Sequence, residues 1–210
     1  MNVEQVKNML LAVCDAVVAA KETLTEIDSA IGDGDHGIGM ALGLSGAKAA
    51  ILAKDTFASV NEVFMLTGMT MLNSMGGASG VIFSSLFLGG LKGRPAATEL
   101  TAPLLTEMLR QALEAIKTRG GASVGDKTMV DALEPAVLAM EAGGSDDLAV
   151  RLREAWRSAE AGVLKTKDQV AVFGRAKSLG ERAIGHQDAG ATSVAIIFTA
   201  MADFAAARQD

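Results

Sequence analysis

The stretch from Val63 to Leu91 carries no charged side chain, and it constrains the fold more than any other part of the sequence. It is long enough to cross a membrane as a single helix. However, the polar, glycine-rich segment NSMGGASG at Asn73–Gly80 divides it into two short apolar pieces. No Lys- or Arg-rich flank marks a cytoplasmic side. The stretch therefore predicts two helices buried at the centre of a bundle, with membrane insertion as the minor alternative.

The composition favours a helical protein. Half of the 210 residues are hydrophobic, but only 4% are aromatic and there is no Tyr. An aliphatic core rich in Ala, Leu and Met favours helices over sheets. The length suits one domain, and we expect residues 1–210 to form it. A net charge of −6, with no basic stripe and few aromatic rings, argues against a nucleic-acid-binding surface.

The cysteine content and the N-terminus bear on location. The single cysteine, Cys14, excludes an internal disulfide, and its place on the apolar face of the first helix predicts a buried structural thiol. The N-terminal segment has the pattern of an amphipathic helix rather than of a signal peptide. Both features predict a reducing, cytoplasmic location.

Apolar residues at helical spacing predict eight helices and no strand. Their expected ranges are 3–21, 38–53, 59–75, 79–91, 101–118, 126–142, 145–165 and 191–207. Ser59, Thr101 and Ser145 are expected to cap the third, fifth and seventh helices. Pro135 is expected to kink the sixth.

The connections after the odd-numbered helices differ from the others. All four are rich in Gly together with Asp, Ser, Thr, His or Arg, whereas the three that follow even-numbered helices are the plain segments KDTFA, KGRPAATEL and GGSDD. In an up-and-down bundle, the four odd connections lie at the same end. We therefore expect an all-α, barrel-like bundle of eight antiparallel helices with a site on these loops. The alternative is that helix ends attract Gly regardless of function.

The first of these connections holds Asp28, Asp33 and Asp35 among glycines. No Cys or His cluster accompanies the acids, so Mg²⁺ or Ca²⁺ is favoured over zinc. The EF-hand pattern fails, because the positions that require Gly and Glu hold Ile38 and Leu44. The alternative is a solvated turn whose acids cap the next helix. We favour a metal site because the three acids are close in sequence on a glycine-rich loop.

Two further connections suit anionic ligands. GGASG and GHQDAGATS place glycines at the starts of apolar helices, where backbone amides bind phosphate, and Ser79 adds a donor. Arg175 is a candidate to neutralise charge in phosphoryl transfer. For Arg182, beside Glu181, a surface ion pair is an equal alternative. His186 remains open between a base, a capping residue and a core residue. These features suggest Mg²⁺ and a polyphosphate on the rim.

Four motifs occur in order along the chain: IGDGDHG, GMTMLNSMGGASG, GDKTMVDAL and LGERAIGHQDAGATS. Together they resemble the nucleotide-binding L subunit of the dihydroxyacetone kinases. The resemblance implies a barrel of eight antiparallel helices that binds ADP or ATP through two Mg²⁺ held by Asp28, Asp33 and Asp35. It also implies Arg175 as the catalytic residue. The implied nucleotide contacts are His36, Gly37, Ile38, Gly39, Ala78, Ser79, Gly120, Met129, Arg175, Asp188, Ala189 and Gly190.

The resemblance also implies partners. In this family a separate K subunit holds the ketose, and in one version a phosphohistidine carrier of the phosphotransferase system recharges the bound ADP. The alternatives are a subunit that exchanges free ATP, a kinase subunit for another ketose such as erythrulose, and a non-catalytic nucleotide sensor. The sequence leaves open the ketose, the phosphoryl donor and the oligomeric state, for which a homodimer is one option.

Overall fold

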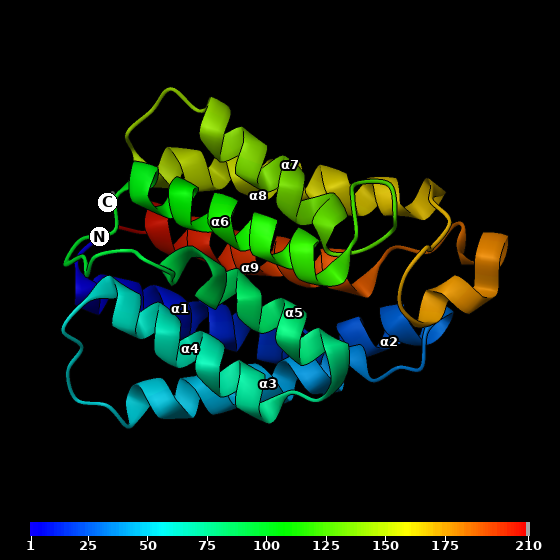
Figure 1. Ribbon diagram of the computed structural model, residues 1–210, viewed down its shortest axis with the longest axis horizontal. Helices are drawn as coiled ribbons and strands as arrows, with labels where there is room; N and C mark the ends of the chain where they lie inside the picture. The colour runs from blue at the N-terminus through cyan, green and yellow to red at the C-terminus, as the bar shows by residue number, and fades with distance from the viewer. Residues whose placement is uncertain (209–210) are drawn as a thin grey trace.

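The computed structural model describes residues 1–208, and these residues are helical with no β-strand (Figure 1). The α-helices are α1 (Val3–Ala19), α2 (Lys21–Ile31), α3 (His36–Leu52), α4 (Val60–Ser74), α5 (Gly77–Leu88), α6 (Ala102–Gly120), α7 (Val130–Ala142), α8 (Leu148–Lys165) and α9 (Ala189–Ala206). Three 3₁₀ segments follow α5 and α8, namely η1 (Gly89–Leu91), η2 (Thr166–Asp168) and η3 (Arg175–Ala183). The all-α class is confirmed, but the predicted count of eight helices is not, because α2 was expected to be loop.

Helix α2 begins directly after Ala20 and buries only two side chains, Leu24 and Ile31. So few apolar positions give a weak periodic signal, although Leu24, Ile27 and Ile31 do have helical spacing. The consequence for the site is that Asp28 lies on a helix and not on a flexible loop.

Capping side chains define several helix starts. Ser59 accepts a hydrogen bond from the Glu62 amide at the start of α4, and Thr101 accepts one from the Leu104 amide at the start of α6, as predicted. The prediction for α8 was wrong, because Asp147, not Ser145, caps it. Helix α7 also begins later than predicted, at Val130.

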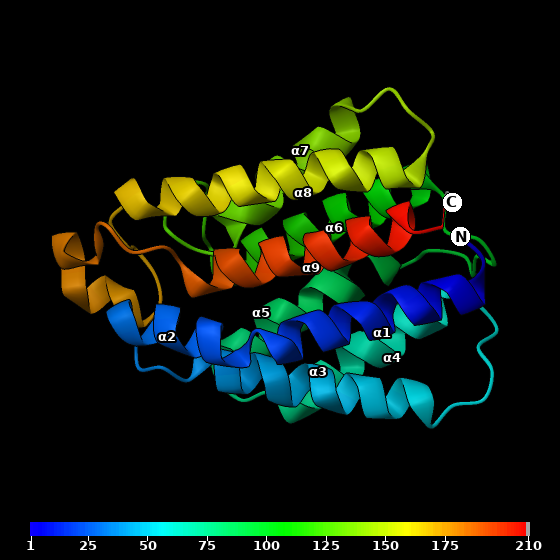
Figure 2. The same cartoon turned by 180° about the vertical axis from the view of Figure 1, so that it is seen from behind.

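Helices that are adjacent in the sequence pack against one another from α3 to α9, and α9 packs back against α1, which contacts α3. Figures 1 and 2 show the result from two sides. The α2–α3, α4–α5, α6–α7 and α8–α9 connections lie at one end of the bundle, on the right in Figure 1, and the chain termini lie at the other. The four polar, glycine-rich connections therefore form one rim.

The uncharged stretch forms most of α4 and all of α5. These helices have 15 and 12 residues, and both are shorter than the roughly 20 residues that span a bilayer. Helix α9 is long and apolar enough to do so by length and composition, but 61% of its apolar window is buried inside the bundle. Cys14 is buried as predicted, and burial raises the pKa of its thiol to about 12. The buried faces of α4, α5 and α9 therefore belong to the hydrophobic core.

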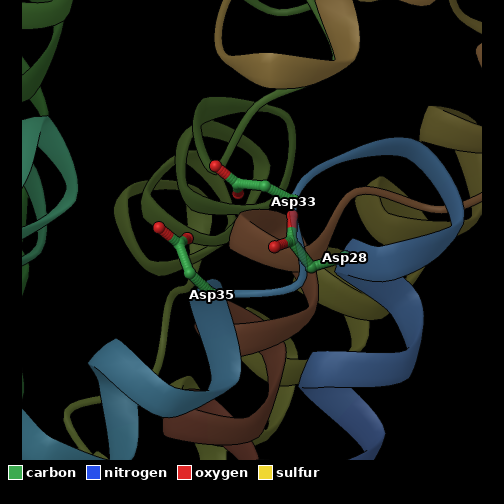
Figure 3. Close-up of side chains that lie close together, drawn as sticks. All are labelled: Asp28, Asp33 and Asp35. Atoms are coloured by element: carbon green, nitrogen blue, oxygen red, sulfur yellow. The ribbon is translucent and has the colours of Figure 1, made fainter.

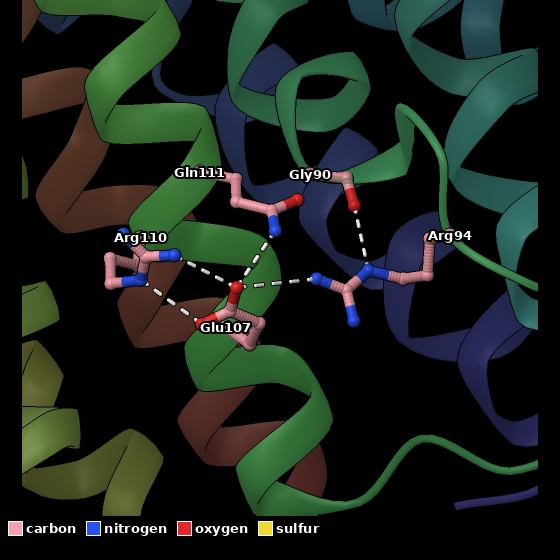
Figure 4. Close-up of polar contacts among 5 residues, drawn as sticks. All are labelled: Gly90, Arg94, Glu107, Arg110 and Gln111. Atoms are coloured by element: carbon pink, nitrogen blue, oxygen red, sulfur yellow. Dashed lines mark hydrogen bonds and ion pairs between the residues drawn. The ribbon is translucent and has the colours of Figure 1, made fainter.

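Segment η1, directly after α5, meets α6 without an intervening side chain. A Cβ atom at Gly90 would lie 2.4 Å from a backbone oxygen of α6. Beside this contact, Glu107 accepts hydrogen bonds from Arg110 and Gln111, and Arg94 approaches it at 3.9 Å (Figure 4). Arg94 also donates to the Gly90 carbonyl at 2.9 Å. This polar cluster fixes η1 against α6 at the surface.

A comparable close approach joins α7 and α8, and it yields a test of the packing. A Cβ atom at Gly162 would lie 2.1 Å from the Asp131 carbonyl oxygen, which has no i+4 amide partner because Pro135 lacks an N–H. We expect Gly162→Ala to destabilise the protein by about 1–3 kcal/mol, because the two helices must separate. Urea unfolding followed by circular dichroism measures this. Gly144→Ala is the control, since no atom lies within 4 Å of its added Cβ. Equal stability of the two variants would contradict the packing argument.

Candidate functional site

Three carboxylates converge at the rim (Figure 3). Asp28 comes from the last turns of α2, Asp33 from the loop that follows, and Asp35 from the position before α3. One oxygen from each lies within 4.8 Å of the others. Asp35 makes no capping hydrogen bond with its side chain, although Asp28 accepts one from the His36 amide at 3.2 Å. Helix capping therefore explains at most one of the three acids.

The glycines of this loop permit the close approach of its backbone to the acids. A Cβ atom at Gly32 would lie 2.5 Å from Asp28 Oδ1, and Gly34 has a φ of +75°. A Cβ atom at Gly37 would lie 2.3 Å from the Lys21 carbonyl oxygen, so glycine is needed to seat α3 on α2. The low side-chain bulk of the loop is thus what allows the carboxylates to gather.

The cluster carries excess negative charge. Burial, and then the charges of Asp33 and Asp28, raise the pKa of the Asp35 carboxyl above its usual value of 3.8. The Arg175 guanidinium opposes this shift, and its Nε lies 2.8 Å from Asp33 Oδ2. The three carboxylates form a donor set made of oxygen atoms only, and the exposed Arg175 offsets part of their negative charge. The residues present therefore fit a hard divalent cation such as Mg²⁺.

His36 connects three helices beneath this loop. Its Nε2 lies 2.8 Å from Ser193 Oγ of α9, and its ring is 5.4 Å from the Phe83 ring of α5. Burial lowers the pKa of His36 below its usual 6.5, with the Asp28 charge opposing the shift, so the imidazole is neutral at neutral pH. The contacts hold the start of α3 beside α5 and α9. Sequence reasoning missed Ser193, whose only signal is a small polar residue within an apolar helix.

The starts of α5 and α9 have different exposures. At α5, Ala78 and Ser79 are exposed, and a Cβ atom at Gly76 or Gly77 would meet nothing within 4 Å. At α9, the Asp188 carboxylate accepts a hydrogen bond from the Ala191 amide at 2.7 Å. Burial raises the pKa of Asp188 to about 7, and that hydrogen bond opposes the rise. The α5 terminus is therefore open to an anionic ligand, whereas the α9 terminus already holds a side chain.

The α6–α7 connection reaches both of these helices. Met129 is buried, and a Cβ atom at Gly190 would lie 3.4 Å from it. Gly120 is the last residue of α6, and a Cβ atom at this position would lie 3.3 Å from Cδ1 of Ile82 in α5. Ile38 is exposed, and Gly39 has open space around it.

Two buried charged residues, Lys127 in this connection and Asp131 in the first turn of α7, went unrecognised in the sequence. Lys127 and Asp131 are both 2% exposed. Asp131 accepts hydrogen bonds from the amides of Gly125 and Thr128, and from the side chain of Gln169 in the α8–α9 connection. The GDK sequence, with an acid four residues after the lysine, was the available signal. The pair joins two of the rim connections.

Two cavities open near this end. One of about 250 Å³ lies beside the aspartates and is lined by Ile31, Gly32, Asp33, Arg175, Ser178 and Leu179. A larger one of about 400 Å³ lies between α8 and α9, is mostly apolar, and is lined by none of the predicted site residues. The smaller cavity is the one that predicted site residues line, namely Asp33 and Arg175.

Residues 30–203 match the family model of the DAK2 domain. The chain belongs to the DAK2 domain family. It is 44% identical over 181 residues to "PEP-dependent dihydroxyacetone kinase 1, ADP-binding subunit DhaL" of Listeria innocua, with 86% of each chain covered. It is 38% identical over 203 residues to the corresponding DhaL subunit of Escherichia coli, covering 94% of this chain and 95% of that protein. The resemblance to the L subunit is thereby confirmed.

Solved structures of the dihydroxyacetone kinase of C. freundii share this fold. The native form has a TM-score of 0.74 at 27% identity, and the match covers 94% of this chain and 34% of that one. The form in complex with AMP-PNP and Mg²⁺ has a TM-score of 0.71. The DAK2 domain chain therefore corresponds to about a third of that larger kinase.

Removing one charge from the aspartate cluster is expected to stabilise the metal-free protein at neutral pH. The folded-state pKa of Asp35 is raised, so its ionisation opposes folding once the pH exceeds the unfolded value near 3.8, and fully so above the folded pKa. We expect Asp35→Asn to increase the free energy of unfolding by less than about 1 kcal/mol at neutral pH, because solvent screens the cluster. The gain should vanish below the unfolded pKa.

Urea titrations in EDTA at both pH values measure this effect. Asp55→Asn, an exposed acid in the α3–α4 connection, is the control for the change in net charge. Destabilisation by Asp35→Asn at neutral pH would show that the cluster does not repel itself.

Proposed function

We propose that this chain is the ADP- or ATP-binding L subunit of a dihydroxyacetone kinase, working in the cytoplasm as a single domain over residues 1–210. The observation that carries the proposal is the convergence of three carboxylates, within 4.8 Å, on the rim that also holds an open glycine-rich helix start. The chain spans 86–95% of the length of the two DhaL relatives described above, which supports the same role.

In this proposal, Asp28, Asp33 and Asp35 hold two Mg²⁺ ions. The aspartates and a nucleotide diphosphate are all anionic, so they repel each other unless cations lie between them. The three carboxylates would hold the ions beside the phosphates, where Mg²⁺ would neutralise the charge that develops in phosphoryl transfer. The AMP-PNP and Mg²⁺ in the C. freundii complex support this assignment.

Backbone amides supply the remaining phosphate contacts. The segment from His36 to Gly39 begins α3, and Ala78 and Ser79 begin α5, so their amides point toward the rim and the helix dipoles favour an anion there. Asp188, Ala189 and Gly190 complete the nucleotide site from α9. Gly120 and Met129 border the adenosine.

Arg175 is the catalytic residue of the proposal. Its guanidinium already lies beside Asp33 and is 77% exposed, so it can turn toward a phosphoryl group without losing buried packing. Phosphoryl transfer depends mainly on alignment and on neutralising charge. The residues of this chain supply both functions, and any base for the acceptor hydroxyl comes from the partner.

The ketose is held by a separate K subunit. The relatives from Listeria innocua and Escherichia coli are named ADP-binding subunits, and the match covers 86% and 95% of their length, which supports a partner that holds the ketose. A phosphohistidine carrier of the phosphotransferase system recharges ADP in place, and the subunit itself forms either a monomer or a homodimer.

Mg²⁺ and ADP together are expected to raise the melting temperature much more than either alone. A ligand that binds only the native state stabilises it, by about 4 kcal/mol at a thousandfold excess over Kd. Asp33→Asn should abolish this joint effect and leave the helical circular dichroism intact. Asp55→Asn should retain it.

Retention of ADP on a desalting column in Mg²⁺, with release by EDTA, is the expected behaviour of an ADP coenzyme. A protein that emerges free of nucleotide would favour exchange of free ATP instead. The absence of any joint stabilisation would contradict the nucleotide site itself.

Arg175→Ala is expected to lower kcat and kcat/KM together in a reconstituted reaction with a K subunit and dihydroxyacetone. An arginine that acts on the charge of the transition state has this signature. Arg182→Ala is the matched control, because Arg182 is exposed on the same 3₁₀ segment. A rise in KM alone would make Arg175 a binding residue only.

A further inference from the structure

Lys127 has an unusual environment for a lysine. It is 2% exposed, and Asp131 is the other charged residue buried to this extent among residues 1–208. Its φ of 59° makes it the one non-glycine residue with a positive φ in the same range. A buried ammonium and a left-handed backbone are both costly, so they persist only where the surroundings enforce them.

The side chain of Lys127 joins the two ends of the α8–α9 connection. Its Nζ donates hydrogen bonds to the Thr166 carbonyl, directly after α8, and to the His186 carbonyl, shortly before α9. One cation therefore fastens both ends of the segment that carries Arg175. Such closure reduces the conformational freedom of the segment between the two points.

Two further hydrogen bonds hold the same two ends of the α8–α9 connection, which together form its base. The Gly185 amide donates to the Lys167 carbonyl at 2.7 Å, and the Asp188 amide donates to Thr166 Oγ1 at 2.9 Å. Toward the tip of the segment, the geometry relaxes: Gly174 and Gly180 have positive φ, and added Cβ atoms there would meet nothing within 4 Å. The ends of the connection are fixed by several bonds. Nearer the tip, the Val172 amide donates to the Asp126 carbonyl at 3.2 Å, Phe173 packs against the core, and Arg175 pairs with Asp33.

Charges around Lys127 match its position. Burial lowers the pKa of its ammonium, while Asp188, Asp131 and Asp168 oppose this shift. In return, the Lys127 charge opposes the rise in the pKa of Asp188 at the start of α9. Lys127 thus favours an ionised Asp188 within the proposed nucleotide site.

We propose that Lys127 is a positioning residue, which fastens the base of the α8–α9 connection and thereby holds Arg175 over the aspartates. This inference rests on the proposed function, in which Arg175 acts on the transferred phosphoryl group. Lys127 acts on Arg175 through the backbone carbonyls of Thr166 and His186, to which its ammonium donates.

The decisive experiment compares Lys127→Met in two backgrounds, in the reaction reconstituted with a K subunit and dihydroxyacetone. We expect kcat to fall by about 100-fold in the wild-type background, because small misplacements of a catalytic group have effects of this size. In the Arg175→Ala background, the same change should have no further effect. Lys177→Met is the matched control, since Lys177 is exposed on the same connection.

A wild-type kcat in Lys127→Met would overturn the proposal. So would an equal fold-loss in both backgrounds, because a general loss of structure would not depend on Arg175. Lys127→Gly guards against misfolding, since glycine accepts the left-handed backbone.

A second measurement needs no nucleotide and separates this inference from the proposed function. Trypsin under native conditions should cleave at Arg175, Lys177 and Arg182 faster in Lys127→Gly than in the wild type, with an unchanged far-ultraviolet spectrum. Unchanged cleavage would reject the fastening role. Failure of the wild type to bind ADP with Mg²⁺ would instead reject the proposed function, and the cleavage result would still stand.

Discussion

Burial of nearly charge-free helix faces is the constraint on which the rest of the structure depends. Helices α4 and α5 have few polar side chains along most of their length, so most of their apolar surface must pack against neighbours. Met65, Met69 and Val81 nevertheless stay exposed. The side-by-side order of the helices, with α9 packed against α1, satisfies this requirement. Because the faces are occupied with packing, charged chemistry is left to the ends of the helices. The rim is therefore a consequence of the core, and not a separate addition to it.

A second constraint acts on the polar groups at the rim: clustered negative charge is partly neutralised by cationic side chains from distant parts of the chain. The aspartates of the α2–α3 loop are partly offset by Arg175, and the buried Asp131 and Asp188 by Lys127. Both cations act on the α8–α9 connection, one at its base and one at its tip. These contacts hold the long connection together with the burial of Ala171 and Ala183 and the packing of Phe173 against the core.

The sequence was sufficient for those features that have local signals. Apolar spacing located most helices, and Ser59 and Thr101 marked two of their starts. The composition of the loops singled out the four connections that lie at one end of the bundle. It was insufficient where long-range contacts decide. The late start of α7 depends on the left-handed Lys127, whose bonds reach residues far along the chain. Helix α2 has too few buried side chains for its pattern to stand out, and the Ser193 contact with His36 joins opposite ends of the sequence.

The three aspartates also differ from the rest of the rim in their sequence separation, which is small. All of them belong to one short hairpin of α2 and α3, which Gly37 seats together, whereas Arg175, Lys127 and the start of α9 arrive from distant parts of the chain. The entropy lost in gathering the acids is therefore small, and that of assembling the other groups is large. Partial loosening of the bundle separates the arginine from the acids before it disperses the acids themselves. In the proposed site, we therefore expect cation affinity and nucleotide affinity to depend on structural units of different size.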